Sequence, residues 1–209
     1  LSTRGQQFVF APKFELGGES RRLVAALSDS EVTILDLLAE DDANVLREVP
    51  LTLSEAEQIK RPVQAIFDVT PEPSLPDTVS LYVLTNRGSD ITQVSIQPSA
   101  RQDATYTFDL SVNQLAAGAN PGQMALLELP ARGARLMALD RSSAAFTMVD
   151  VESGEGATFT LPMARAATQM VVYTASRREG SDETEEVRVL AYSPESPVVT
   201  VIRPETISI

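Results

Sequence analysis

Few residue types that carry out catalysis are present in this chain. Its 209 residues include no histidine and no cysteine, which removes the commonest general base, the cysteine nucleophile and the imidazole and thiolate ligands of zinc. Carboxylate chemistry remains, because glycoside hydrolysis needs two acids about 5–10 Å apart across a cleft. The candidate acids end apolar runs and are Asp36, Asp68, Asp140 and Asp150. An Asp in that position more commonly caps a turn by accepting backbone N–H bonds, and turn capping is the interpretation we favour.

A Ser–Lys dyad is the other nucleophilic scheme that the composition leaves open. Lys13 and Lys60 are the only lysines. Ser54 lies six residues before Lys60, where Ser54 and Glu57 form a capping-box pattern that predicts a short helix over residues 55–60. Because Ser54 and Lys60 would lie at opposite ends of that helix, we disfavour the dyad.

Metal binding has one weak candidate. Hard cations such as calcium take several carboxylate and carbonyl oxygens, and the charged stretch 177–186 could supply Asp182, Glu183 and Glu185. The stretch lacks the spacing of an EF-hand, so a solvated loop that lengthens a strand connection is the preferred interpretation. We therefore expect no cofactor, with calcium as the alternative.

The overall charge restricts the partners. The formal net charge is −12 and the isoelectric point is near 4.5. Such a surface would repel the phosphate backbone of a nucleic acid and the headgroups of an anionic membrane, so we expect neither as a partner. No apolar run approaches the roughly 20 residues of a membrane-spanning helix. Acidity keeps a protein soluble and can also attract basic partner surfaces.

The elements that would position these residues are short paired strands. An apolar run, a polar turn and a β-branched run recur at 40–60-residue intervals, the spacing of propeller blades. The pairs are residues 23–27 with 31–37, 81–86 with 90–96, 136–140 with 145–151, and, more loosely, 187–192 with 198–202. Residues 28–30, 87–90 and 141–143 are the polar turns. Although the Leu- and Ala-rich stretch 23–38 has some helical spacing, the turn at 28–30 favours strands.

The strand that follows each pair has a different pattern. Phe108 and Leu110 alternate with polar neighbours, as do Phe159 and Leu161, which indicates one wet and one buried face. The paired runs before them are apolar on both faces. This gradient from inner strands to a rim strand favours a β-propeller over a sandwich.

Two stretches carry a family resemblance. Residues 118–125 read Gly-Ala-Asn-Pro-Gly-Gln-Met-Ala and lead to the runs 136–140 and 146–150, while residues 81–86 read Leu-Tyr-Val-Leu-Thr-Asn. This order resembles the YVTN-type β-propeller repeats of bacterial surface proteins, closely in two repeats and loosely in two more. Residues 68–79 and 177–186 depart from the pattern as insertions. The resemblance implies a propeller, and an exported protein of the periplasm or cell surface.

We therefore predict an all-β, single-domain chain over residues 1–209, a propeller-like array of about four four-stranded blades. The approximate repeats are 6–52, 62–112, 122–161 and 168–209. The last repeat shows no clear rim strand. An incomplete ring or a piece of a larger one is favoured over a four-bladed ring closed by Gln7–Phe10 and over an open array completed by a partner.

The leading functional hypothesis is a non-catalytic binding or scaffold module of the bacterial envelope or exterior, with a protein or glycan ligand held by inter-blade loops. Alternatives are a carboxylate-based carbohydrate-active enzyme and a structural piece of a larger assembly that self-associates or is completed by another chain. Propellers gather their inter-blade loops at one end of the axis. The candidate binding residues in those loops are Arg61, Asn113, Gln114, Asn120 and Arg165.

Overall fold

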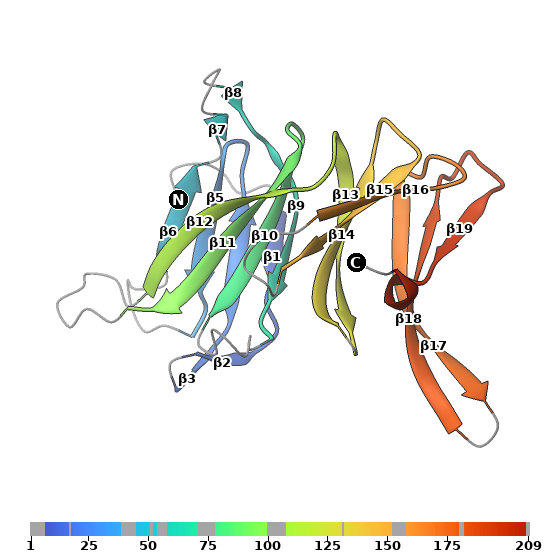
Figure 1. Cartoon of the computed structure of the whole chain (residues 1–209). Coiled ribbons are helices and arrows are strands. Elements are labelled where there is room, and N and C mark those ends of the chain that lie inside the picture. The colour runs from blue at the N-terminus through green and yellow to red at the C-terminus, as the bar shows by residue number, and fades with distance from the viewer. Residues whose placement is uncertain are drawn as a thin grey trace. The chain divides into compact units, whose positions relative to one another are not determined.

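The computed structural model describes residues 7–16, 18–38, 45–50, 52–53, 58–70, 78–99, 108–130, 132–151, 158–179 and 182–207, with the backbone alone described at 45–48, 50, 52–53, 58–59, 177–179 and 182–183. Within this part of the chain the regular structure is antiparallel strand, apart from one 3-10 helix, η2 (Pro204–Thr206) (Figure 1). The prediction of an all-β chain is confirmed. The chain divides into two compact units, Leu1–Gln114 and Leu115–Ile209.

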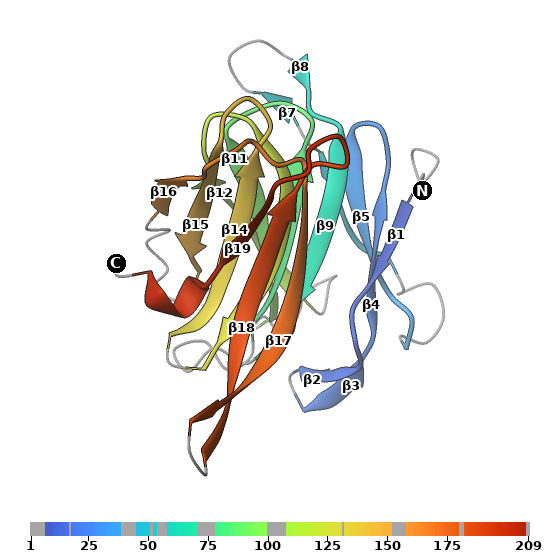
Figure 2. The same ribbon diagram turned by 90° about the vertical axis from the view of Figure 1, so that its right-hand side faces the viewer.

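Unit 1 contains two four-stranded sheets and two small hairpins. Sheet I consists, in spatial order, of β1 (Gln7–Phe10), β4 (Leu23–Leu27), β5 (Glu31–Asp36) and β6 (Val45–Pro50). Sheet II consists of β9 (Pro62–Asp68), β10 (Val79–Thr85), β11 (Asp90–Pro98) and β12 (Phe108–Ala116). The hairpin of β2 (Phe14–Leu16) and β3 (Glu19–Arg21) lies between β1 and β4 in sequence, and that of β7 (Thr52–Leu53) and β8 (Gln58–Ile59) joins the sheets (Figure 2).

Unit 2 contains one four-stranded and one three-stranded sheet. Sheet III consists of β13 (Pro121–Leu129), β14 (Gly133–Asp140), β15 (Ala145–Asp150) and β16 (Thr158–Pro162). Sheet IV consists of β17 (Gln169–Glu179), β18 (Asp182–Tyr192) and β19 (Val199–Ile202). In all four sheets the strands that follow one another in sequence are neighbours in space, apart from the hairpin inserted in sheet I.

Each unit is held together by two sheets that pack through apolar residues. In unit 1, Leu81 lies opposite Phe67 and Val94 across strands β9, β10 and β11 of sheet II, and this row joins Ala25 and Ile34 of sheet I in one buried cluster. In unit 2 the cluster combines residues of sheet III with Val189, Ala191 and Ile202 of sheet IV, including Leu127, Met137, Leu139 and Met148. Burial of each large side chain stabilises its unit by roughly 1.5–3 kcal/mol.

In sheets II and III the central strands are drier than the last strand, whereas in sheets I and IV the first strand, β1 or β17, is also largely exposed. All five residues of β4 are buried, as are nearly all of those in β10 and β14. The last strands of sheets II and III differ: β16 alternates between exposed and half-buried positions, and most of β12 is exposed. The paired runs and polar turns were therefore located correctly from local pattern, including strands rather than helix at residues 23–27 and 31–36.

The structure corrects two details of the sequence interpretation, the helix at 55–60 and the loop at 177–186, and defines the pairing of Gln7–Phe10. The helix expected over residues 55–60 is not formed in its described part, because Gln58 and Ile59 pair with Leu53 and Thr52 as β-strand; Ser54 and Glu57 lie outside the described residues. The strand Gln7–Phe10, which the disfavoured four-bladed ring would use for closure, pairs with β4 in sheet I. The stretch 177–186 is largely strand, since Arg177 lies opposite Thr184 and Arg178 opposite Glu183 in a long hairpin.

Candidate binding surface

In unit 1 the connection into sheet II is fixed to the hairpin turn of that sheet. The backbone N–H of Arg61 donates to Asn86 Oδ1 at 3.0 Å, and the N–H of Asn86 donates to the carbonyl of Arg61 at 2.8 Å. The exposed Arg61 guanidinium reaches Asp29 in the β4–β5 turn, with Nε 3.2 Å from Oδ1. The turns of sheets I and II and the β8–β9 connection therefore lie together at one end of unit 1.

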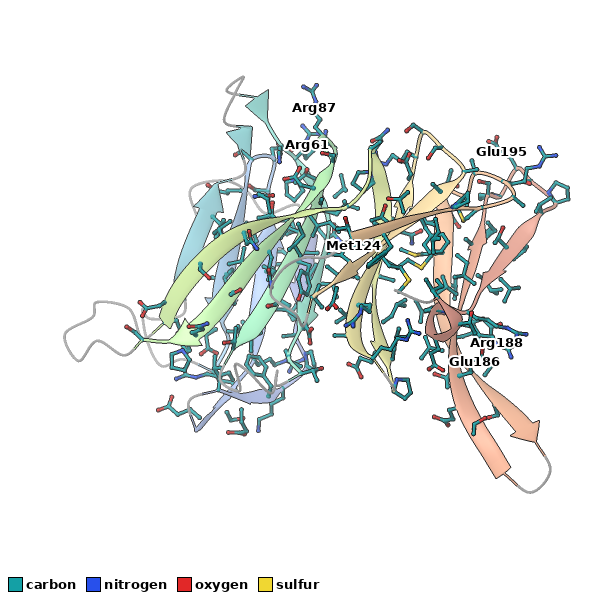
Figure 3. All side chains as sticks on the ribbon, in the orientation of Figure 1. Arg61, Arg87, Met124, Glu186, Arg188 and Glu195 are labelled. Atoms are coloured by element: carbon teal, nitrogen blue, oxygen red, sulfur yellow. The ribbon has the colours of Figure 1, made fainter. Side chains whose placement is uncertain are left out.

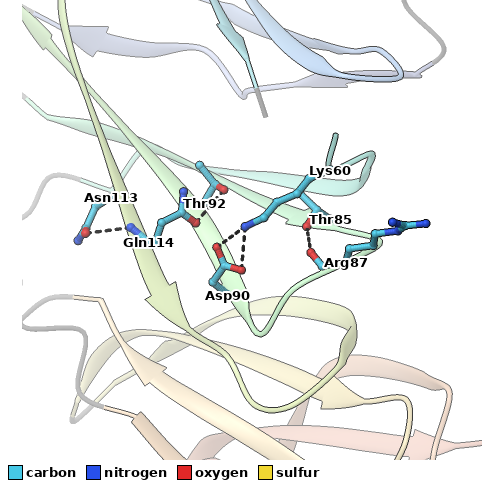
Figure 4. A network of polar contacts seen from close by, with 7 residues as sticks. All are labelled: Lys60, Thr85, Arg87, Asp90, Thr92, Asn113 and Gln114. Carbon is cyan, nitrogen blue, oxygen red and sulfur yellow. Dashed lines mark hydrogen bonds and ion pairs between the residues drawn. The ribbon is translucent and has the colours of Figure 1, made fainter. Parts of the chain in front are cut away.

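Next to this junction lies a buried ion pair. Lys60 Nζ lies 2.7 Å from Asp90 Oδ2 and 3.0 Å from Asp90 Oδ1, and the two side chains are 7% and 20% exposed (Figure 4). Gly88, at φ +104°, passes so close that a Cβ there would lie 2.5 Å from Asp90 Oδ1. The backbone of the β10–β11 turn therefore covers the pair, and only glycine fits at that position.

Asn113 and Gln114 extend the same set of polar contacts (Figure 4). The Thr92 hydroxyl donates to Gln114 Oε1 at 3.1 Å, and the Gln114 N–H donates to Asn113 Oδ1 at 2.9 Å. Both residues lie in strand β12 rather than in the loop expected from the sequence. Strand β12 continues to Ala116 although residues 111–114 are all exposed, so the strand extends further than the polar residues suggest.

In unit 2 the equivalent junction is organised by Asp140, which ends β14. Asp140 Oδ1 accepts hydrogen bonds from the Ser142 N–H and hydroxyl, both at 2.7 Å, and from the Ser143 N–H at 3.0 Å. Its Oδ2 accepts one from the Asn120 N–H at 3.3 Å. Burial acts to raise the pKa of Asp140, but the hydrogen bonds from Ser142, Asn120 and Ser143 outweigh it and lower the pKa.

The two junctions repeat one local structure. Arg61 and Asn120 each precede a proline that begins the first strand of a sheet, and the carbonyl of each accepts the N–H of the residue that opens the hairpin turn, Asn86 or Arg141, at 2.8 Å. Pro62 lies opposite Thr85 and Pro121 opposite Asp140, each at a register irregularity. Proline fits here because the first residue of an edge strand can lack a ladder N–H.

Arg165 lies in the connection from sheet III to sheet IV and is exposed. That connection is attached at both ends: the Met163 N–H donates to the carbonyl of Ala144, and the Thr168 N–H donates to that of Tyr192. Within unit 2 the turn of sheet III, this connection and the turn of sheet IV are thus linked.

A glutamine side chain joins the two sheets of unit 2. Gln123 Oε1 on β13 accepts the Met170 N–H of β17 at 2.6 Å, and Gln123 Nε2 donates to the Met170 carbonyl at 3.5 Å. The amide side chain thus satisfies a backbone donor and acceptor of the neighbouring sheet.

The strand-end acids have local partners. Asp36 is fully buried. Its Oδ1 accepts a hydrogen bond from the Leu38 N–H, and its Oδ2 accepts one from Arg21 Nη1 at 2.8 Å. The Arg21 guanidinium also lies 5.0 Å from the centre of the Phe108 ring. Asp68 accepts the Thr70 N–H, and Asp150 pairs with Arg135 at 3.1 Å. Turn capping accounts for Asp36, Asp68 and Asp140, as favoured, and an ion pair across neighbouring strands accounts for Asp150.

The calcium candidates lie in β18, with Glu185 exposed. Among the residues that the structure describes, no three acids form a group suited to a metal ion.

The sequence candidates thus separate between the units: Arg61, Asn113 and Gln114 lie in unit 1, and Asn120 and Arg165 in unit 2. The Lys60–Asp90 pair was not predicted. A signal existed, since Lys60 is one of only two lysines and precedes the Arg-Pro junction, but its partner is 30 residues away.

No protein-family model, no curated protein and no solved structure matches the chain. Over the described residues, no helix has the length and apolar character needed to cross a membrane.

Proposed function

We propose that this chain is a non-catalytic binding or scaffold module of the bacterial envelope or exterior, in which a β-propeller-like array presents a protein or glycan ligand site on its loops. The consecutive antiparallel sheets and the exposed last strands of sheets II and III support the array. The location rests on the resemblance to YVTN-type repeats.

One observation carries the proposal: the loop ends of an acidic chain present arginines. Arg61 and Arg87 are exposed at the loop end of unit 1 (Figure 3), and Arg141 and Arg165 are exposed in the corresponding segments of unit 2. Arginine offers a planar fork of donors that matches carboxylates. With a net charge of −12, such cations favour carboxylate groups on a protein or on an acidic glycan at these ends.

The carbohydrate-active alternative gains no support from the contacts of the strand-end acids. Asp36, Asp140 and Asp150 are each held by backbone N–H groups or by an arginine. Residues so engaged are positioned to stabilise turns and strand pairs.

The test measures binding by wild type, by the double variant Arg61→Ala/Arg87→Ala and by Arg165→Ala. Two formats are used: an array of neutral glycans and of glycans that carry uronate or sialate, and crosslinking to proteins of a bacterial envelope extract. Loss of one charge-assisted arginine contact is expected to weaken binding about tenfold. Arg22→Ala is the matched control, because Arg22 is exposed at the opposite end of β4 from its turn.

Binding that is lost in the loop variants and kept in Arg22→Ala, at unchanged melting temperature, would support the proposal. Absence of wild-type binding in both formats, or equal loss in the control, would refute it.

A further inference from the structure

All the sulfur of this chain lies in unit 2. The sequence has five methionines and no cysteine. The methionines all belong to the second compact unit and are Met124, Met137, Met148, Met163 and Met170 (sulfur atoms yellow in Figure 3). Unit 1 therefore has neither a thioether nor a thiol that an oxidant of the peroxide class could attack.

Four of the five methionines are closed to solvent. Met137 is fully buried, Met124 and Met148 are 1% exposed, and Met170 is 6% exposed. Met163 differs, because it is only half-buried. An oxidant must reach the sulfur atom to react, and a buried side chain is reached only when the structure opens locally. In the folded protein a dissolved oxidant therefore reaches Met163 first.

Met163 connects the surface of unit 2 to its core. It directly follows β16 in the connection to β17, and its N–H donates to the Ala144 carbonyl at 2.7 Å. Its side chain packs against the buried cluster that holds sheet III to sheet IV. Ala167, further along the same connection, is a buried member of that cluster. A change at Met163 therefore acts on the contact between the two sheets of this unit.

The cluster beside Met163 suits a thioether and does not suit a sulfoxide. Its members are apolar, and they include Met137 and Met148 of sheet III and Val189 of sheet IV. A sulfoxide oxygen is polar, and it loses its hydrogen bonds to water when it is buried against such side chains. The oxidised side chain must turn toward solvent, and its contact with the cluster is then lost.

We propose that Met163 is a site of reversible oxidation through which peroxides loosen the core between sheets III and IV of unit 2. The sulfur lone pair attacks one oxygen of hydrogen peroxide, so that an S–O bond forms and the O–O bond breaks. The transferred oxygen gives its proton to the departing hydroxide. The thioether is thus oxidised to a sulfoxide and the peroxide is reduced to water. Methionine sulfoxide reductases return the sulfoxide to the thioether. The proposal stands apart from the loop-end function.

The first measurement locates the added oxygen. The folded chain is treated with hydrogen peroxide, and peptide mass spectrometry follows the gain of one oxygen atom at each methionine with time. Met163 is expected to react about tenfold or more faster than the other four, because those react only after local opening. In urea the rates should converge, since burial then no longer protects any of them. Faster reaction at a buried methionine of the folded chain would overturn the proposal.

The second measurement follows the consequence by hydrogen–deuterium exchange. Oxidation of Met163 should accelerate amide exchange in β14 and β18 by about fivefold or more, the lower end of the cost of burying an unsatisfied polar group. Strand β10 of the methionine-free unit 1 is the internal control and should be unchanged. The two sulfoxide reductases, one for each epimer, should restore the slow exchange. Unchanged exchange in unit 2 after complete oxidation of Met163, equal acceleration in both units, or no restoration would each refute the proposal.

Three substitutions separate Met163 from the other methionines. Met163→Leu keeps an apolar side chain of similar volume without sulfur, so unit 2 should keep its slow exchange in peroxide. Met163→Gln places a polar group at the same position and should accelerate exchange without peroxide. Met170→Leu is the matched control, because it removes a sulfur atom from the same cluster and should respond to peroxide as wild type does. A Met163→Leu protein that still responds, or a Met170→Leu protein that does not, would contradict the assignment to Met163.

Discussion

The buried pair of Lys60 and Asp90 offers a perturbation whose size can be worked out in advance. Asp90→Ala removes the counter-charge of an ammonium group that is 7% exposed, while Lys60→Met leaves behind a carboxylate that is 20% exposed and can regain water. We therefore expect the aspartate substitution to cost more than the lysine substitution.

The magnitude follows from the two contacts of 2.7 and 3.0 Å. Unit charges about 3 Å apart attract by about 5 kcal/mol at an effective dielectric constant near 20. The partial exposure of Asp90 reduces this value, so we expect Asp90→Ala to lower the free energy of unfolding by about 2–3 kcal/mol and Lys60→Met by about 1–2 kcal/mol. The double variant should lose less than the sum.

Urea unfolding followed by circular dichroism measures these losses, and at a slope of 1–3 kcal/mol per molar a loss of 2–3 kcal/mol moves the midpoint by roughly 1 M. Asp29→Ala is the matched control, because it breaks the Arg61–Asp29 pair, whose side chains are 59% and 56% exposed. That exposed pair should contribute about 0.5 kcal/mol or less.

Two results would refute the reasoning. If Asp90→Ala costs no more than Asp29→Ala, the buried pair does not stabilise unit 1. If Lys60→Met costs more than Asp90→Ala, exposure does not control the energy of the unpaired charge.

Two further substitutions test the junction in unit 2. The folded-state pKa of Asp140 lies below its ordinary value of 3.8. Its charge therefore contributes stability above that pH, and this contribution is lost as the pH falls through the folded-state pKa. Asp140→Asn should lower the melting temperature at pH 7 and make the melting temperature fall less steeply at acidic pH, and an equally steep fall in wild type and variant would contradict this. Gly118→Ala should cost more than Gly18→Ala in thermal unfolding. Both glycines have positive φ, but a Cβ at 118 would lie 2.8 Å from Thr147 Oγ1, whereas nothing lies within 4 Å at 18. Equal losses would show that backbone strain alone matters.

Much of the fold could be predicted because its signals are local. The runs 23–27, 81–84 and 136–139 are apolar at consecutive positions, and residues 28–30, 87–89 and 141–143 are turn formers. A side-chain period of two and turn chemistry act over a few residues. They therefore predict strands, hairpins and the drier inner strands without knowledge of distant contacts.

The errors arose where distant pairing outweighs a local signal. The capping-box pattern of Ser54 and Glu57 predicted helix, yet Gln58–Ile59 pairs with Thr52–Leu53. The charges of residues 177–186 suggested a loop, but the two halves of this stretch pair as the end of the β17–β18 hairpin, where Arg178 lies opposite Glu183. Gln114 was assigned to a loop, yet it lies in β12, and its side chain accepts a hydrogen bond from Thr92 of the neighbouring strand β11.

The sequence by itself determined the all-β class, the strand pairs and the absence of histidine and cysteine chemistry, because composition and short-range alternation are properties of the chain alone. Only the tertiary structure decided that Lys60 meets Asp90, that Gln123 bonds to Met170, and that Phe10 and Val201 remain exposed. These outcomes depend on strand register and on which faces pack together. Register and packing are settled by the burial of many residues at once.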